Sequence, residues 1–498
     1  MTLSALLPVL ILATSLVPSV LMFLLPERAA RARTVINVAG AAAKVVLVFL
    51  LLRGVAAGAT YEARFALVPG LELLLRVDAL SLLFLTLSAV LWLATTVYAL
   101  SYLAGTPDQN RFFAFFSLCV VATTGIALAG TPITFFFFYE LLTLATYPLV
   151  VHRGDPAALA GGRKYLAYTL AGSIVLLVGI VWLESMVGPI EFTRAGALEE
   201  MRRTTPDALR AAFVLLVGGL AVKAALVPLH SWLPSAMVAP APVSALLHAV
   251  AVVKAGAFGI VRVIFDVYGI DAVEGLGLGV PLAAAASATI LYGSVRALTQ
   301  SDIKRRLAYS TVSQVSYIVL GVALGGPTAA IGGLVHLVHQ GLMKVTLFFC
   351  AGAFAETVHV HRIDQMDGLG PRMPWTMLAF SIAAFGMIGV PPVAGFVSKW
   401  YLGIGSLEAG HAWVILVLAV SSLLNAAYFL PLVYRAWFLP PAGPWEEMRP
   451  GRRYETDAGM FLPPVATSLA ALLVGLLAAT ELSPLSWTRL IVERGYAP

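Results

Sequence analysis

The sequence predicts an all-α, polytopic membrane protein. Of its 498 residues, 60% are hydrophobic and only 12% are charged, whereas a soluble domain carries about 25% charged residues. The apolar residues gather in runs of about 20, the length with which a helix crosses the hydrocarbon core of a bilayer. The period of two residues that is typical of an outer-membrane barrel does not run through these segments.

The apolar runs and the residues that interrupt them predict about fourteen transmembrane helices. We expect these helices at 3–25, 34–53, 78–101, 111–129, 132–151, 164–186, 209–238, 242–266, 280–298, 306–325, 328–355, 374–405, 411–438 and 459–480. The first run lacks a basic leader and a cleavage site with small residues, so we expect it to be retained as a helix.

Prolines interrupt two of the expected helices. The seventh (209–238) contains Pro228, and the twelfth (374–405) contains Pro391 and Pro392. A proline inside a helix removes a backbone hydrogen bond, and such a break survives at membrane depth only inside protein or beside a wet cavity. Chance placement is one explanation. The other is two repeats, the fourth to eighth and the ninth to thirteenth helices, which are inverted because each has an odd number of helices.

This interpretation divides the chain into four parts. Residues 1–105 hold the first three helices, 106–268 the first repeat, 278–438 the second repeat, and 439–498 a linker, the last helix and a short tail.

The basic residues of the loops predict an orientation. Seventeen Lys and Arg residues lie in loops on one expected side and ten on the other. The positive-inside rule places the richer side in the cytoplasm, so we expect a multi-pass protein of the cell inner (plasma) membrane with both termini extracytoplasmic. The net charge of +6 then records orientation, and we expect no nucleic-acid partner.

The five remaining basic residues lie inside apolar runs: Lys44, Lys223, Lys254, Lys344 and Lys399. A charged residue at the centre of a membrane helix costs about 2.5–3.5 kcal/mol on insertion scales, so such residues usually mark a function. Glu140 lies equally deep, about eight residues into its expected helix. If Glu140 and Lys223 face each other, a change in their separation alters how firmly each holds its proton.

These residues and four histidines predict a line of proton-carrying groups, because histidine titrates near neutrality and a buried lysine gives up its proton readily. The predicted proton pathway is Glu140, Lys223, His230, His248, Lys254, His336, His339, Lys344 and Lys399. A structural explanation exists for each: a static ion pair for Glu140 and Lys223, a backbone cap for His230, and core packing for the rest. We expect Lys44 to face a neighbouring subunit or to reach the interface, outside the pathway.

Several motifs are missing from the sequence. It contains no Walker motif, no G-x-G-x-x-G after a strand and no cysteine cluster, and Cys119 and Cys350 lie far apart in apolar runs. We therefore expect no cofactor and no metal site, and a driving force from an ion gradient or from partner subunits.

Motifs distributed along the chain resemble those of the antiporter-like, proton-translocating membrane subunits of respiratory complex I, membrane-bound hydrogenases and Mrp-type cation/proton antiporters. The resemblance rests on Leu229-His230-Ser231-Trp232-Leu233-Pro234 and its continuation to residue 249. It extends, in order, to the segments 77–84, 138–141, 300–305, 308–314 and 389–396.

The resemblance implies fourteen core helices in two inverted repeats, a Glu140–Lys223 pair, a central Lys254 and a terminal Lys399. Lysine rather than glutamate at 399 is similar to the Mrp D type or the distal complex I subunit. The distal subunit carries a long lateral helix after its core, and this chain ends about eighteen residues past its last expected helix. That difference favours the D-like or hydrogenase-related type.

Our leading hypothesis is therefore a proton-translocating subunit of a multisubunit monovalent cation/proton antiporter, which works with other membrane subunits on protons and Na⁺ or K⁺. The alternative is the same module driven by redox partners, as in a complex I-like or hydrogenase assembly. A proton-tight scaffold and a partner in anion or carbon uptake are further hypotheses. The sequence leaves the cation, the stoichiometry and the half-channel directions open.

Overall fold

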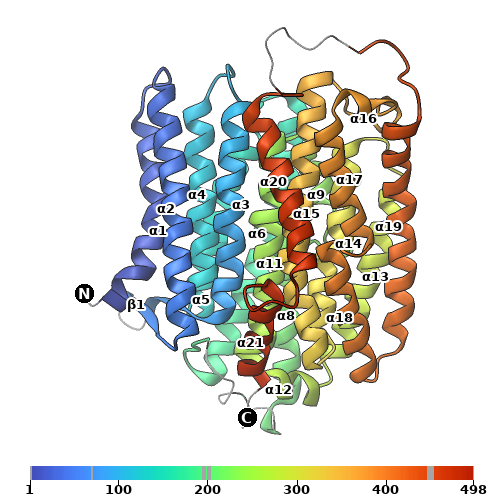
Figure 1. Cartoon of the computed structure of the whole chain (residues 1–498). Helices are drawn as coiled ribbons and strands as arrows, with labels where there is room; N and C mark the ends of the chain where they lie inside the picture. The colour runs from blue at the N-terminus through green and yellow to red at the C-terminus, as the bar shows by residue number, and fades with distance from the viewer. Residues whose placement is uncertain (1–2, 69–70, 193–197, 199–202, 446–453, 497–498) are drawn as a thin grey trace.

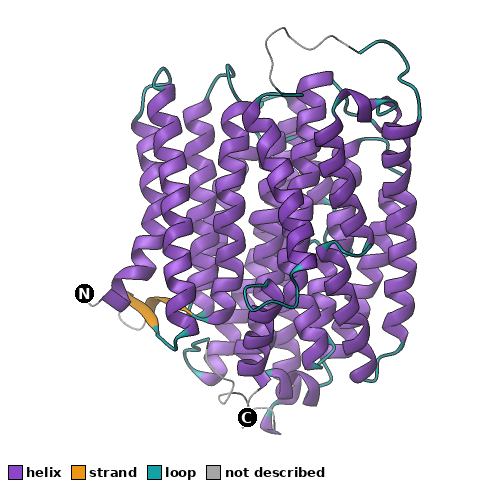
Figure 2. Cartoon of the chain, in the orientation of Figure 1, coloured by secondary structure: helices purple, strands orange, loops and turns teal. Residues whose placement is uncertain are grey.

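The computed structural model describes residues 3–68, 71–192, 198, 203–445 and 454–496. Long helices stand side by side in one bundle (Figure 1), and strands occur only in a small hairpin at one end of the described part (Figure 2). The ends of the chain lie toward the same end of the bundle (Figure 1). Five of the basic loop residues counted above lie outside the described residues: Arg194, Arg202, Arg449, Arg452 and Arg453.

The first half of the bundle is built from long helices, followed by short ones. They are α1 (Leu3–Leu24), α2 (Ala30–Ala56), α3 (Ala79–Tyr102), α4 (Gln109–Leu128), α5 (Pro132–Val150), α6 (Pro156–Val187), α8 (Pro206–Ala224), α9 (Trp232–Ser235), η1 (Ala236–Val238), α10 (Ala241–Ala245), η2 (Leu246–Val250), α11 (Val252–Arg262), η3 (Val263–Tyr268) and α12 (Ile270–Gly275).

The second half of the bundle is also built from long and short helices. It contains α13 (Gly279–Leu298), α14 (Ile303–Ala323), α15 (Pro327–Val358), η4 (Ile363–Gln365), α16 (Leu369–Arg372), α17 (Pro374–Ile388), α18 (Ala394–Glu408), α19 (Trp413–Phe438), α20 (Ala458–Leu476) and α21 (Pro484–Tyr496).

The membrane-helix class is confirmed. Within the described ranges, nine helices are long and apolar enough to cross a membrane: α1 to α6, α15, α19 and α20. The count of fourteen helices and the inverted repeats stay predictions.

Polar caps set where several helices begin. The side chains of Thr131, Asp155 and Asp302 each accept a hydrogen bond from a backbone N–H in the first turn of α5, α6 and α14. Such caps satisfy donors that have no partner inside the helix. In α5 and α6 a proline follows the cap, where its missing N–H is harmless.

The sequence predicts only helices, and the structure adds a hairpin between α2 and α3. Strands β1 (Tyr61–Val68) and β2 (Leu71–Val77) are antiparallel, with Glu62 opposite Arg76. Their side chains form an ion pair of 2.9 Å, which Glu191 extends through a 2.6 Å contact with Arg76. Opposite charges directly across a strand pair stabilise its register. The segment is short and polar on one face, so it carries no transmembrane signal.

Both predicted helix breaks are confirmed. Helix α8 ends at Ala224, ahead of Pro228, and α17 ends at Ile388, ahead of Pro391 and Pro392. The chain resumes as the short helix α9 after the first break and as α18 after the second. The carbonyls at the end of a helix have no partner within it, so each break presents backbone acceptors inside the bundle.

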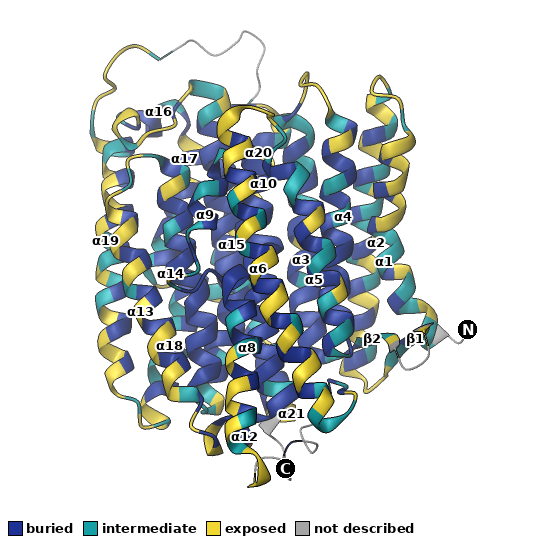
Figure 3. Cartoon of the chain, turned by 180° about the vertical axis from the view of Figure 1, so that it is seen from behind, coloured by how far each residue is buried: buried dark blue, intermediate teal, exposed yellow. Residues whose placement is uncertain are grey.

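Helix α15 forms the centre of the molecule. In the apolar 18-residue stretch of α15, 94% of the residues are buried, compared with 33% in the corresponding stretch of α1 and 28% in that of α2. Figure 3 shows the same contrast, with buried residues along the inner helices and exposed residues on the outward faces of helices such as α13 and α19. A helix buried on all sides can carry polar residues only if other helices provide their partners.

Candidate functional site

The predicted pathway residues occupy the inner helices. Glu140 lies on α5, Lys223 in the last turn of α8, Lys254 on α11 and Lys399 on α18. His336, His339 and Lys344 lie on α15, His248 in the π-helical turn η2, and His230 in the segment that follows the first break. Glu140 and Lys399 are partly exposed, whereas the other seven are buried.

Glu140 and Lys223 lie close together without a direct ion pair. The Lys223 ammonium donates to the backbone oxygen of Tyr139 and lies 3.2 Å from the centre of its ring. The Glu140 carboxylate accepts a hydrogen bond from Ser173 on α6 and is near enough to Lys223 for the two charges to interact. The expected pair is therefore near but separated, with the Tyr139 ring and carbonyl as the direct contacts of the ammonium. Ser173 was not predicted, because a lone serine in an apolar helix carries no signal.

Lys254 links the first half of the bundle to α15. Its ammonium is fully buried and donates to the Leu337 carbonyl at 2.8 Å. Leu337 follows His336, whose Nδ1 lies 2.8 Å from the Ser398 hydroxyl. Because Ser398 precedes Lys399, one turn of α15 contacts both the central lysine and the segment that carries the terminal lysine.

Lys399 uses the backbone that the second break exposes. Its ammonium donates to the carbonyls of Ile388 at 2.8 Å and Met387 at 3.2 Å, and to the Ser422 hydroxyl at 3.0 Å. Both carbonyls belong to the last turn of α17, where helical partners are missing. No carboxylate forms an ion pair with Lys399 among the described residues. The break therefore provides uncharged acceptors, which hold an ammonium without fixing it in a salt bridge.

Lys344, His248 and His339 are buried deep in the bundle. The Lys344 ammonium donates to the Ser310 hydroxyl at 2.7 Å and to the Leu307 carbonyl at 3.1 Å. Neither ring nitrogen of His248 or His339 has a hydrogen-bond partner among the described protein atoms. Buried polar atoms of this kind are where ordered water completes a polar chain.

His230 lies in a different setting. Its ring centre is 5.0 Å from that of Tyr292 and 6.2 Å from that of Tyr309, and it is 7% exposed. These contacts place it against α13 and α14 beside the first break. They do not connect it to the lysines, so its role in the pathway stays a prediction.

The expectation for Lys44 is wrong. Its side chain is fully buried rather than at an interface, and its ammonium donates to Thr124 at 2.5 Å and to Ser15 at 3.0 Å. It also lies 5.1 Å from the centre of the Trp92 ring. Small hydroxyl side chains on α1 and α4 make room for it, and a single sequence does not reveal that these helices close around α2.

We expect Lys44→Met to preserve proton translocation and to leave the unfolding temperature unchanged or raise it. Replacing a buried charge by an apolar side chain of similar length is often neutral or stabilising. Proton flux and thermal unfolding of the assembled complex measure both effects. A loss of flux in an intact, assembled variant would instead add Lys44 to the pathway.

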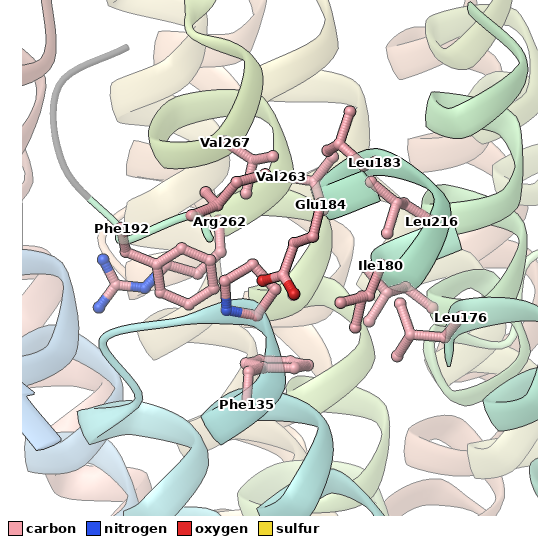
Figure 4. Close-up of a pocket in the computed structure, with 14 residues that line it drawn as sticks. Phe135, Leu176, Ile180, Leu183, Glu184, Phe192, Leu216, Arg262, Val263 and Val267 are labelled. Atoms are coloured by element: carbon pink, nitrogen blue, oxygen red, sulfur yellow. The ribbon is translucent and has the colours of Figure 1, made fainter. Parts of the chain in front are cut away.

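Arg262 is one of the ten basic residues counted above on the less basic side, and it is buried inside the bundle rather than in a loop. It is 2% exposed, and its guanidinium contacts Asp78 at 2.8 Å and Asp266 at 2.7 Å. An apolar cavity lies beside it, lined by Phe135, Leu176 and their neighbours, with Glu184 directed into it (Figure 4). The ion pairs of Arg262 with Asp78 and Asp266 connect α11 and η3 to the start of α3. The sequence signal was present as an Arg–Asp pair four residues apart.

We expect Arg262→Ala to destabilise the protein by about 3 kcal/mol, because it leaves two partly buried carboxylates without their cation. Denaturant unfolding in detergent measures this loss. Arg64→Ala is the matched control, because Arg64 is 45% exposed in its pair with Glu191 and exposed pairs contribute at most about 1 kcal/mol. Equal losses in the two variants would contradict a structural role for the buried cluster.

Within the described ranges, no three His, Cys, Asp or Glu side chains gather closely enough to hold a metal ion.

The chain is similar to several known proteins. A family model described as NADH:quinone oxidoreductase/Mrp antiporter, TM, matches residues 129–425. The chain is 39% identical over 422 residues to NADH-quinone oxidoreductase subunit N of Desulforudis audaxviator (strain MP104C), and the match covers 82% of each chain. It is 28% identical over 400 residues to the D-type subunit of the Na(+)/H(+) antiporter of Bacillus subtilis (strain 168), and this match covers 80% of this chain and 78% of that one.

The fold is similar to that of a chain in the Mrp complex from Dietzia sp. DQ12-45-1b. The TM-score is 0.84 at 26% sequence identity, and the match covers 100% of this chain and 98% of the other. The family match takes in both broken helices and every predicted pathway residue. The chain belongs to the NADH:quinone oxidoreductase/Mrp antiporter transmembrane family.

Proposed function

We propose that this chain is the proton-translocating subunit of a multisubunit monovalent cation/proton antiporter. Protons cross the membrane through the mid-membrane line of Glu, Lys and His, and the exchanged cation is Na⁺ or K⁺. The chain works with other membrane subunits in the cell inner membrane, with both termini extracytoplasmic. The two five-helix repeats, 106–268 and 278–438, each carry part of the line.

One observation carries this proposal: four buried or half-buried lysines in the line have neutral partners. Lys223, Lys254, Lys344 and Lys399 donate to carbonyls or hydroxyls, and no described carboxylate forms a salt bridge with them. An ammonium in a tight ion pair is stabilised in one state. A lysine held by neutral acceptors can take up and release a proton without breaking a buried salt bridge, which a proton line requires.

A redox-driven pumping module is the second candidate. The 39% identity to subunit N of an NADH-quinone oxidoreductase supports it, whereas the match to a D-type antiporter chain and the likeness to an Mrp complex support the antiporter. In both cases the chain moves protons through the same residues. The difference lies in what its partners do.

The composition of the native complex distinguishes the two candidates. We would purify the chain from its own membrane and identify the co-purifying chains by mass spectrometry. The antiporter proposal expects hydrophobic partners without redox centres. Partners that carry Fe–S clusters, flavin or nickel–iron sites would contradict it and make this chain the pumping arm of a redox enzyme.

A further inference from the structure

Hydrogen bonds join Lys344 to a buried tyrosine through a serine. The Lys344 ammonium donates to Ser310 Oγ at 2.7 Å, and the Tyr428 hydroxyl lies 2.9 Å from the same oxygen. On its other side the Tyr428 hydroxyl lies 2.7 Å from Asn425 Oδ1. Ser310, Asn425 and Tyr428 are fully buried and come from α14 and α19. Their polar atoms therefore depend on one another.

The same connection continues to Lys399. The Asn425 amide donates to the Met387 carbonyl at 3.1 Å, and the Lys399 ammonium donates to the same carbonyl at 3.2 Å. The series Lys344, Ser310, Tyr428, Asn425, Met387 carbonyl and Lys399 is thus continuous. It runs from the centre of α15 to the second helix break without a gap.

The Tyr428 hydroxyl gives this series two arrangements. It has one hydrogen, so it donates either to Ser310 or to Asn425. When Lys344 is an ammonium it donates to Ser310, the serine hydrogen is free to turn toward Tyr428, and Tyr428 donates to Asn425. When Lys344 is a neutral amine it can accept from Ser310, so Tyr428 turns to Ser310 and Asn425 loses a donor. Asn425 shares the Met387 carbonyl with Lys399, so the change reaches the terminal lysine.

We propose that Ser310, Asn425 and Tyr428 are positioning residues that couple the proton occupancy of Lys344 to that of Lys399. This inference rests on the proposed proton-translocating function and adds a direct connection between two of its sites. The side chain of an asparagine does not carry an excess proton, so the series transmits the orientation of hydrogen bonds rather than the proton itself. A chain of hydrogen bonds in a medium of low dielectric constant responds as a unit.

Other titratable groups surround the two lysines and are part of any pH response. From the elements packed here they are Lys254, His248, His336, Tyr317 and Arg306. Of these, Arg306 contacts the backbone of Tyr428, at 2.9 Å. A test must therefore change the hydroxyl of Tyr428 and leave these groups in place.

Tyr428→Phe makes that change, because it removes the hydroxyl and keeps the ring. In membrane vesicles that hold the intact complex, we expect cation-dependent proton flux to fall about tenfold, with a changed dependence of rate on pH. We expect Ser310→Ala combined with Tyr428→Phe to be no slower than the slower single variant, because both interrupt one series. Tyr268→Phe is the matched control, since its buried hydroxyl donates to the Leu209 carbonyl at 2.7 Å, outside the series.

The inference is overturned if Tyr428→Phe has the same proton flux as Tyr268→Phe. It is also overturned if the flux losses of Ser310→Ala and Tyr428→Phe multiply in the double variant while the dependence of rate on pH stays unchanged, because purely structural residues would behave in this way. Lys399→Ala, measured beside them, separates this failure from failure of the proposed function. If Lys399→Ala loses flux and Tyr428→Phe does not, only the coupling is wrong; if Lys399→Ala also keeps its flux, the proposed function is wrong as well. Should Tyr428→Phe not assemble, Ser310→Ala alone provides the same test.

Discussion

Lys399→Ala is expected to lower cation-dependent proton flux at least about tenfold, a loss that corresponds to about 1.4 kcal/mol or more in the barrier. The reason is geometric. Lys399 is the titratable group at the second helix break, and its ammonium holds the free carbonyls of Met387 and Ile388. Alanine removes the proton carrier and leaves the Ile388 carbonyl without the donor that Lys399 provides, whereas Asn425 still donates to the Met387 carbonyl. The measurement is the rate of pH change in vesicles after addition of Na⁺ or K⁺.

Lys44→Met is the matched control for this experiment. Lys44 is also buried and also held by neutral oxygens, but it lies among α1, α2 and α4, away from the second break. Assembly of both variants is checked by the partners that co-purify. Wild-type flux in an assembled Lys399→Ala complex would remove Lys399 from the pathway. Equal losses in both variants would mean that any buried lysine is needed for assembly rather than for transport.

The second large effect is expected for Glu140→Gln. Glutamine keeps the size of the side chain and can still accept the hydrogen bond from Ser173, but it removes the negative charge that acts on Lys223. Among the residues that the structure describes, the Lys223 ammonium then keeps the Tyr139 ring and carbonyl as its partners. We expect proton flux to fall about tenfold or more, measured in the same vesicles.

Glu184→Gln on α6 is the control for a carboxylate within the bundle, because Glu184 faces the apolar cavity rather than Lys223 (Figure 4). We expect this variant to translocate protons like the wild type. If Glu140→Gln also translocates protons like the wild type, the pair of Glu140 and Lys223 takes no part in transport, and Lys223 is a structural residue.

Much of the fold could be predicted from the sequence because its signals are local. Long apolar runs require membrane helices, and Pro228, Pro391 and Pro392 required the two breaks that the structure contains. The hairpin between α2 and α3 was missed, because its signal is an eight-residue strand with alternating charges. The helical patterns on either side of that segment are much stronger than its own strand pattern.

Residues of the candidate site could be predicted from the sequence only where burying their side chains costs much free energy. Lysine and glutamate inside apolar helices are rare enough to be noticed, and the structure places Lys254 and Lys344 deep in the bundle. Ser310 and Tyr428 were missed, because serine and tyrosine are ordinary residues of membrane helices and become informative only when α14, α15 and α19 meet. The burial of Arg262 was missed, because one of its two acidic partners, Asp78, lies at the start of a helix far away in the sequence.

The most direct test of the central claim is cation-driven proton flux in proteoliposomes that contain the purified complex and no electron donor. The antiporter account predicts that a gradient of Na⁺ or K⁺ moves protons across the membrane, and that Lys399→Ala abolishes this movement. The account is contradicted if neither cation gradient drives proton flux and the complex pumps protons once an electron donor and acceptor are added. That result is expected of a redox-driven module.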